Sequence, residues 1–143
     1  MTTPTKTVEV KVERTIAAPP GEVFDAWLDP TIPGTAWHEH DRLIVDPRVD
    51  GLWYWLIRGN AHYGRYVEID RPSRVQYSWM SRYTLGEEST VTVTFQKKGE
   101  GTLMSLVHSG LPNEEMAKAH DKGWTSISDN FSNIFVGGSR RRK

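Results

Sequence analysis

The feature that most constrains the fold is a long series of strand-like segments followed by one helical segment at the end of the chain. Residues 8–13 alternate valine with glutamate or lysine, and residues 90–95 alternate threonine with valine or phenylalanine. Such alternation is typical of strands with one buried face. Further strands are expected at 43–45, 51–57, 63–69, 75–79 and 102–107, separated by segments rich in Gly, Pro, Asn and Asp.

Two short helical segments interrupt this series after the first strand. The first follows Pro19 and Pro20 and ends at Asp29-Pro30, and its apolar residues recur at a spacing of four. The second, within 31–41, reads as a loop or irregular helix that carries Trp37. The first is too short to persist without packing against the rest of the fold.

The last segment predicts a long helix over 112–135. Met116, Gly123, Ile127 and Ile134 share one expected face, flanked by His120, Trp124 and Phe131. Glycine disfavours a helix by about 1 kcal/mol relative to alanine. We therefore expect Gly123 to allow a close approach between this helix and the sheet.

These elements predict an α+β fold. Consecutive strands joined by short turns form an antiparallel sheet. A single long helix must cover one face of that sheet. A sheet of about seven strands twists strongly, so it should curl around the C-terminal helix, with two short helices between its first two strands. We expect a single domain over 1–136 and a disordered basic tail over 137–143.

Composition excludes several classes of protein. The chain of 143 residues has no cysteine, which excludes disulfides and thiolate chemistry, and its 18 basic and 18 acidic residues balance. A balanced charge argues against a nucleic-acid-binding protein. No stretch is apolar enough for membrane insertion or a signal peptide, so we expect a cytoplasmic protein.

Six tryptophans are the main candidates for a functional site. They lie at 27, 37, 53, 55, 79 and 124, mostly in segments that should meet inside the fold. Clustered aromatic residues form either a dense core or the wall of an apolar pocket. Trp53 and Trp55 share one strand face, but Leu52, Tyr54 and Leu56 make the other face apolar as well, so alternation alone does not decide which face is buried.

A few polar residues could add chemistry to such an interior. His108 follows two apolar residues on one strand face and could orient a ligand or act as a base, although a hydrogen-bonded core histidine is favoured. Glu68 could form an acid–base pair with it across a cavity. The His38-x-His40-Asp41 segment could bind a metal ion, but a surface loop is favoured. The sequence predicts no metal and no cofactor.

Several motifs together resemble a known family. They are Arg14-Thr15-Ile16-Ala17-Ala18-Pro19-Pro20, Val23-Phe24-Asp25-Ala26-Trp27, Asp29-Pro30, Gly64-x-Tyr66-x-Glu68-Ile69-Asp70-x-Pro72, Glu88-Ser89-Thr90-Val91-Thr92-Val93-Thr94-Phe95, His108-Ser109-Gly110-Leu111-Pro112, His120 and Gly123-Trp124. This order, over about residues 8–130, resembles the AHSA-like family of the SRPBCC superfamily. These are relatives of the C-terminal domain of the heat-shock-protein ATPase activator.

The resemblance implies a START-like helix-grip fold, as in birch-pollen allergens, with a cavity between the curved sheet and the C-terminal helix. Members bind lipids, polyketides or other apolar molecules, and some are cyclases. The aromatic positions of the family match Trp53 and Trp55, which implies that these two side chains point inward. The expected ligand-binding residues are Trp37, Trp53, Trp55, Tyr66, Trp79, Met104, His108, His120, Trp124 and Ile127.

Three functions follow from these observations. Binding of a small hydrophobic or aromatic ligand is favoured, because no motif for covalent catalysis is present. A cyclase or hydrolase acting on such a ligand is the second. A protein-interaction module, with a chaperone as partner, is the third and is not favoured. A homodimer through an apolar sheet face that carries Leu52 and Leu56 stays open.

Overall fold

A computed structural model describes residues 8–136 of the chain, and the predicted basic tail at 137–143 lies outside them. The elements, with η for a short 3-10 helix, are β1 (Val8–Ile16), α1 (Pro20–Trp27), η1 (Ala36–His38), β2 (Arg42–Val45), β3 (Leu52–Ile57), β4 (Asn60–Asp70), β5 (Arg74–Ser81), η2 (Arg82–Thr84), β6 (Ser89–Lys98), β7 (Gly101–Leu111) and α2 (Glu114–Asn133).

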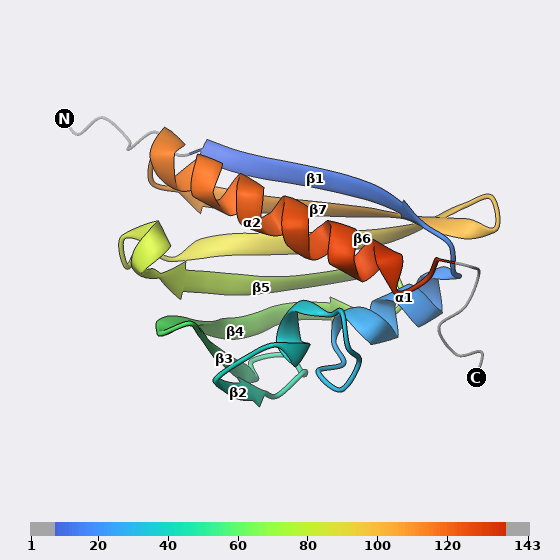
Figure 1. The fold of residues 1–143 in the computed structure, drawn as a ribbon, viewed down its shortest axis with the longest axis horizontal. Helices are drawn as coiled ribbons and strands as arrows, with labels where there is room; N and C mark the ends of the chain where they lie inside the picture. Colours follow the sequence, from blue (N-terminus) through green and yellow to red (C-terminus); the bar gives the residue numbers. More distant parts are fainter. Residues whose placement is uncertain (1–7, 137–143) are drawn as a thin grey trace.

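All seven strands form one antiparallel sheet in the order β1-β7-β6-β5-β4-β3-β2. Figure 1 shows α2 lying across the β1–β7–β6 part of this sheet, while β2, β3 and β4 curve away below it. The predicted α+β class, with a curved antiparallel sheet around a long C-terminal helix, is confirmed. Of the two short helices expected after the first strand, the second is only the single turn η1.

Helix α2 begins where the sequence provides a cap. The side chain of Asn113 accepts a hydrogen bond of 2.9 Å from the backbone N–H of Met116, and Glu114 and Glu115 occupy the first turn. Acidic residues at this end stabilise the helix by interacting with its dipole. Arg14 on β1 donates a 2.8 Å hydrogen bond to Asp129, which ties the second half of α2 to the edge of the sheet.

The buried face of α2 differs from the predicted one. The residues that the structure buries are Ala117, His120, Trp124, Ser128 and Phe131. Met116 and Ile127 are only half-buried, and Gly123 is exposed. The helix is thus rotated so that the residues expected to flank its apolar face form its centre. The sequence pattern alone could not define this rotation, because both stripes contain apolar residues.

One end of the interior is filled by aromatic residues, and we call it the filled end. Trp27 of α1 contacts Phe131 of α2 with ring centroids 5.1 Å apart, and Phe24 contacts Phe95 of β6 at 5.4 Å. Phe131 and Phe135 pack at 5.4 Å. All five side chains are at most 4% exposed, so α1 plugs the space between sheet and helix at this end.

Strand β4 carries a bulge between Tyr66 and Glu68. Alternation places Glu68 on the same face as the buried Tyr66, but the extra residue turns it to the outer face. There it lies opposite Gln76 of β5 and accepts a 2.9 Å hydrogen bond from Arg74. A bulge of this kind inverts the face of every residue that follows it.

Candidate functional site

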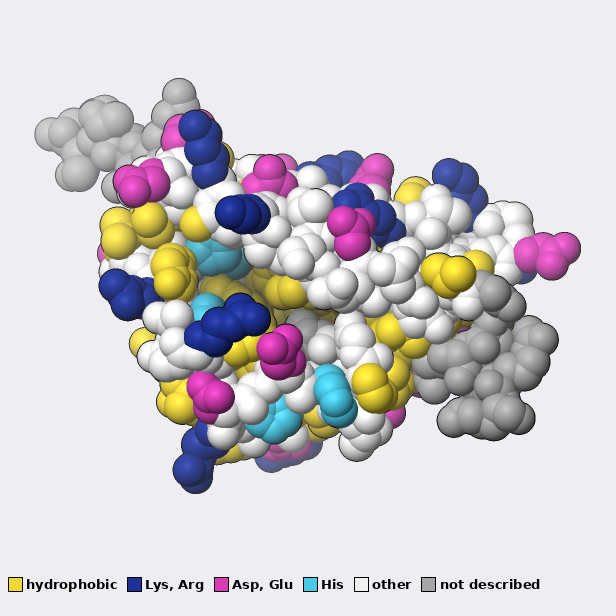
Figure 2. Space-filling model, in the orientation of Figure 1, with side chains coloured by type: hydrophobic (Ala, Val, Ile, Leu, Met, Phe, Trp, Pro, Cys, Tyr) yellow, Lys and Arg dark blue, Asp and Glu magenta, His cyan; other side chains and the backbone are white. Residues whose placement is uncertain are grey.

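A pocket of about 530 Å³ opens at the other end of the interior, between α2 and strands β3, β4 and β5. Figure 2 shows it as a hollow with a hydrophobic floor, in which histidine side chains are visible and around which charged side chains gather. Pockets for small molecules typically span about 300–1,000 Å³. The cavity expected between the sheet and the C-terminal helix is therefore present, and it communicates with solvent. We call this region the hollow end.

Three indole rings, with Ile57 and Ile127, form much of the apolar part of the pocket. Trp55 and Trp79 come from the sheet and Trp124 from α2. The ring of Trp79 lies 6.2 Å from that of Trp55 and 5.1 Å from that of Trp124. The indole N–H of Trp55 donates a 2.9 Å hydrogen bond to the backbone carbonyl of Glu39, which fixes the orientation of this ring.

The helical wall of the pocket includes small side chains beside His120, Trp124 and Ile127. Ala119, Gly123 and Ser126 line it, and a Cβ atom added at Gly123 would meet nothing within 4 Å. The expectation that Gly123 brings the helix close to the sheet is therefore wrong. A larger side chain at this position would extend into the pocket, so glycine keeps this part of it open.

Charged residues surround the mouth of the pocket. The guanidinium of Arg58 lies 3.6 Å from the carboxylate of Glu39, and both side chains are mostly exposed. Lys122 lines the same region from the helix. Exposed ion pairs of this kind stabilise a protein by about 0–1 kcal/mol. These groups can influence the approach of a charged ligand more than they influence folding.

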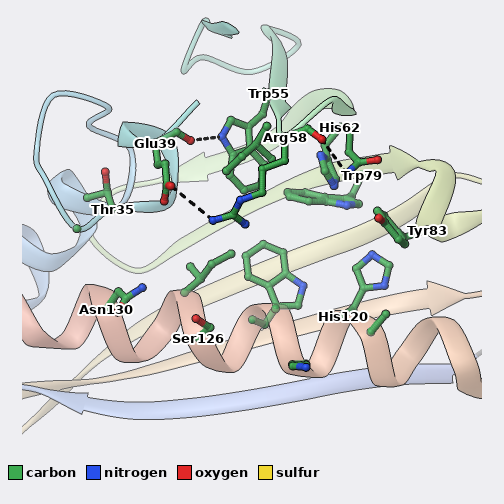
Figure 3. A pocket seen from close by; sticks show the side chains of 18 residues that line it. Thr35, Glu39, Trp55, Arg58, His62, Trp79, Tyr83, His120, Ser126 and Asn130 are labelled. Atoms are coloured by element: carbon green, nitrogen blue, oxygen red, sulfur yellow. Dashed lines mark hydrogen bonds and ion pairs between the residues drawn. The ribbon is translucent and has the colours of Figure 1, made fainter. Parts of the chain in front are cut away.

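The innermost polar groups of the pocket belong to His62, Tyr83 and His120. His62 from β4 and His120 from α2 lie on opposite walls, with Tyr83 of η2 beside them (Figure 3). The His62 ring stacks against Tyr83 with centroids 6.2 Å apart. Burial lowers the pKa of both histidines below its ordinary value, so both are neutral at pH 7.

His108 lies behind the pocket wall and is completely buried. Its Nδ1 accepts a 2.9 Å hydrogen bond from the indole N–H of Trp124. Its Nε2, which then carries the proton, donates to the hydroxyl of Ser89 at 2.7 Å, and that hydroxyl donates to the carbonyl of Trp79. Burial lowers the pKa of His108 to about 3.

This network makes His108 a structural residue. Both ring nitrogens already have partners, and neither His108 nor Ser89 lines the pocket. The serine–histidine contact has the short distance of a nucleophile and its base, yet the histidine nitrogen carries the proton and donates it to the hydroxyl, and the pair faces the interior of the fold. The hydrogen-bonded core histidine favoured by the sequence is the arrangement that the structure shows.

The structure does not bring Glu68 and His108 together. Glu68 is on the outer face of β4 with Arg74, whereas His108 is on the inner face of β7. The predicted acid–base pair is therefore wrong, because the bulge in β4 turns Glu68 to the outer face.

The histidines of the His38-x-His40-Asp41 loop make contacts with the backbone. Their Nδ1 atoms bond to the carbonyl oxygens of Pro30 and Trp37, respectively.

The ten predicted ligand-binding residues divide into two groups. Those that line the pocket are Trp55, Trp79, His120, Trp124 and Ile127. Those that do not line it are Trp37, Trp53, Tyr66, Met104 and His108, and all five are buried. Trp37 instead borders a void of about 10 Å³ behind Trp55, Trp79 and Trp124.

Trp53 and Trp55 point the same way from β3 but have different surroundings. Trp53 is paired with Gly64 across the sheet and donates a 3.1 Å hydrogen bond to the carbonyl of Ser78. A Cβ atom at Gly64 would lie 2.0 Å from that carbonyl oxygen. The glycine thus makes room for close packing of the sheet under the Trp53 ring. The Trp53 side chain is therefore part of the core and does not line the pocket.

Sequence analysis missed several residues of the pocket, notably His62, Tyr83 and Arg58. His62 pairs with Trp55 across the sheet, so register could have identified it once Trp55 was assigned to the inner face. Tyr83 and Arg58 lie in η2 and in the β3–β4 turn. No periodic pattern exists in such segments to assign a side chain to the pocket.

The fold and the pocket define a class of protein. A curved antiparallel sheet that clasps a C-terminal helix and leaves an aromatic pocket between them is the helix-grip architecture. In the described residues 8–136, no cluster of metal-ligating side chains occurs. Within the same residues, no helix combines the length and apolar character needed to cross a bilayer.

Comparison with protein families identifies the chain more closely. The family described as "Activator of Hsp90 ATPase homolog 1-like protein" matches residues 17–135. The chain belongs to this family, which confirms the resemblance noted in the sequence. A comparison with curated proteins finds no match.

Solved structures with the same fold come from varied organisms. CalU16 from Micromonospora echinospora is 25% identical, with a TM-score of 0.72 over 90% of this chain and 76% of its own. An HSP90 activator from Plasmodium falciparum is 24% identical, with a TM-score of 0.71 over 89% and 92% of the two chains. The Aha1 dimer from Colwellia psychrerythraea is 12% identical, with a TM-score of 0.74 over 92% and 98%.

Proposed function

We propose that this protein binds a small hydrophobic or aromatic molecule in the pocket at the hollow end. The observation that supports this most is the combination of about 530 Å³ of space with three indole rings on its walls. Apolar walls with a few convergent polar groups are the usual composition of a small-molecule site. The fold allows ligand binding, cyclisation chemistry and chaperone activation, and the pocket favours the first.

The energetics of packing also support a ligand. Apolar surface that is removed from water stabilises a complex by about 25 cal/mol per Å². Trp55, Trp79 and Trp124 are only 7%, 4% and 3% exposed, so the apolar surface left for a ligand to cover includes that of Ile57, Ala119 and Ile127. The small residues Ala119 and Gly123 on α2 leave the space that a flat guest needs.

The proposal is tested by filling the pocket from a position that lies outside the core. Gly123→Phe places a ring in the pocket, and Lys118→Phe, at an exposed position of the same helix that does not line the pocket, is the matched control. In thermal-shift assays, naphthalene derivatives, anthraquinone and lauric acid should raise the Tm of the parent and of the control. They should not raise the Tm of Gly123→Phe. A ligand at 100 times its Kd stabilises by about 2.7 kcal/mol.

The opposite pattern would count against ligand binding. If none of these probes changes the Tm of the parent protein, or if Gly123→Phe responds as strongly as the parent, the pocket is not the site. Because Gly123 is exposed, the Phe variant should fold, and its far-UV circular dichroism spectrum verifies this.

A protein-interaction function is the second candidate, and the outer face of the sheet favours it. Ile44, Leu52 and Tyr63 lie there with 51%, 58% and 41% of their surface exposed. Exposed apolar patches often mark interaction sites. Leu52→Glu should abolish self-association measured by light scattering, or any stimulation of Hsp90 ATPase activity.

The expected cytoplasmic location stays a prediction.

A further inference from the structure

The inner end of the pocket contains a hydrogen-bond acceptor that the protein itself does not use. His120 is 8% exposed, and its Nδ1 lies 2.8 Å from the carbonyl oxygen of Met116, one turn earlier in α2. A carbonyl oxygen only accepts, so Nδ1 must carry the proton. In the neutral ring Nε2 then has a free lone pair, and no described residue donates to it.

His62, on the opposite wall, has a second unused group. It is 9% exposed, and its Nδ1 is buried without a hydrogen-bond partner among the described residues. Figure 3 shows His62 and His120 on facing walls at the same end of the pocket. A buried polar atom without a partner lowers stability by about 1–3 kcal/mol. The buried Nδ1 of His62 is out of reach of a ligand, so a ligand gains by donating to Nε2 of His120.

The chemistry of these two rings selects a class of ligand. A carboxylate would place its lone pairs against the lone pair of His120 Nε2, and the nearest charged groups, Arg58 and Lys122, lie at the mouth instead. A hydroxyl group can donate to Nε2 of His120, with the neutral ring of His62 facing it across the pocket. The indoles of Trp55, Trp79 and Trp124 suit a flat aromatic body.

We infer that the pocket binds a hydroxylated aromatic molecule whose O–H donates to Nε2 of His120, with its ring against the wall that the three indoles line. This inference rests on the proposed function and adds the orientation and polar chemistry of the ligand. His120 positions the ligand and needs no part in a reaction. The free lone pair, the facing His62 and the indole walls are independent observations that agree on this class.

Three probes of nearly equal size test the inference in the unmodified protein. They are 2-naphthol, 2-methoxynaphthalene, which lacks the donor, and 2-naphthoate, which carries a charge. Isothermal titration at pH 7 should give 2-naphthol a Kd roughly tenfold lower than that of 2-methoxynaphthalene, the size of effect expected from one hydrogen bond. In ¹⁵N-histidine NMR spectra, Nε2 of His120 should shift with 2-naphthol and not with the ether.

Variants assign the effect to His120. His120→Leu should bring the Kd values of 2-naphthol and 2-methoxynaphthalene together, and His120→Gln, which keeps an acceptor oxygen, should restore part of the difference. His38→Leu is the control, because Nδ1 of this exposed histidine also contacts a backbone carbonyl but the ring does not line the pocket.

The outcomes are distinguishable. Equal Kd values for 2-naphthol and its ether, tighter binding of 2-naphthoate, or a preference that survives in His120→Leu would overturn the inference while the pocket remains a binding site. Absence of binding by all three probes would overturn both the inference and the proposed function.

Discussion

The filled end and the hollow end of the interior are built from the same kinds of residue, yet only one of them is packed solid. At the filled end, α1 contributes Phe24 and Trp27, which occupy the space between sheet and helix. At the hollow end the single turn η1 packs on β3 through Trp37, and α2 presents Ala119 and Gly123 beside His120 and Trp124. Aromatic content therefore does not distinguish core from pocket, whereas the small residues opposite the aromatic ones do.

The largest expected effect comes from the filled end. Phe131→Ala should lower the free energy of unfolding by about 3–5 kcal/mol, because it removes a fully buried ring and leaves a cavity. Urea denaturation followed by circular dichroism measures this change. Ile127→Ala, at a half-buried position in the wall of the pocket, should lower the free energy of unfolding clearly less than Phe131→Ala does. Equal losses would show that the two ends do not differ in packing.

The pH dependence of stability tests the contribution of the buried His108, which bonds to Trp124 and Ser89 behind the hollow end. The folded-state pKa of His108 is about 3, below the unfolded value near 6.5, so the unfolded chain binds more protons between these values. This contribution to stability is complete above pH 6.5 and is lost as the pH falls towards 3, by about 1.4 kcal/mol per pH unit.

Urea titrations at pH 7 and pH 5 measure this slope. His108→Gln, which cannot titrate in this range, should have a shallower slope than the parent. A slope that His108→Gln leaves unchanged would mean that other groups carry the dependence, with His62 and His120 as the first to test.

A pair of glycine substitutions sharpens the comparison of space. Gly123→Ala should stabilise the protein by about 1 kcal/mol, because the new Cβ meets nothing and alanine favours the helix. Gly64→Ala should destabilise it, because its Cβ would lie 2.0 Å from the carbonyl oxygen of Ser78. Thermal unfolding of both variants checks the signs, and a destabilised Gly123→Ala would contradict the open wall.

The smallest effect is expected at the mouth of the pocket. Arg58→Gln should change the free energy of unfolding by less than about 0.5 kcal/mol, because its ion pair with Glu39 is exposed. Chemical denaturation at low and high salt measures it. A larger, salt-sensitive loss would indicate that the mouth is a structural element.

Most of the fold could be predicted from the sequence because it depends on local patterns. Alternation defined the strands, turn residues separated them, and the resemblance added the helix-grip arrangement. The bulge at Tyr66 and Glu68 could not be predicted, because both residues are compatible with either face. It moved Glu68 to the outer surface and removed it from the candidate site.

The candidate site was only partly predictable for a related reason. Trp53 and Trp55 are equivalent in alternation, and only the register with β4 places Gly64 opposite one and His62 opposite the other. The rotation of α2 likewise decides that Gly123 faces the pocket and Trp124 forms its wall. Such facts depend on contacts between distant segments, which single-strand patterns do not contain.

The close spacing of the indoles has an optical consequence. Trp37, Trp53, Trp79 and Trp124 follow one another with ring centroids between 4.7 and 5.4 Å apart. At such separations excitation absorbed by any one ring transfers readily to the others. Emission from the whole series therefore responds to whatever quenches Trp79 or Trp124, so a molecule that enters the pocket changes the intrinsic fluorescence of the protein without any added label.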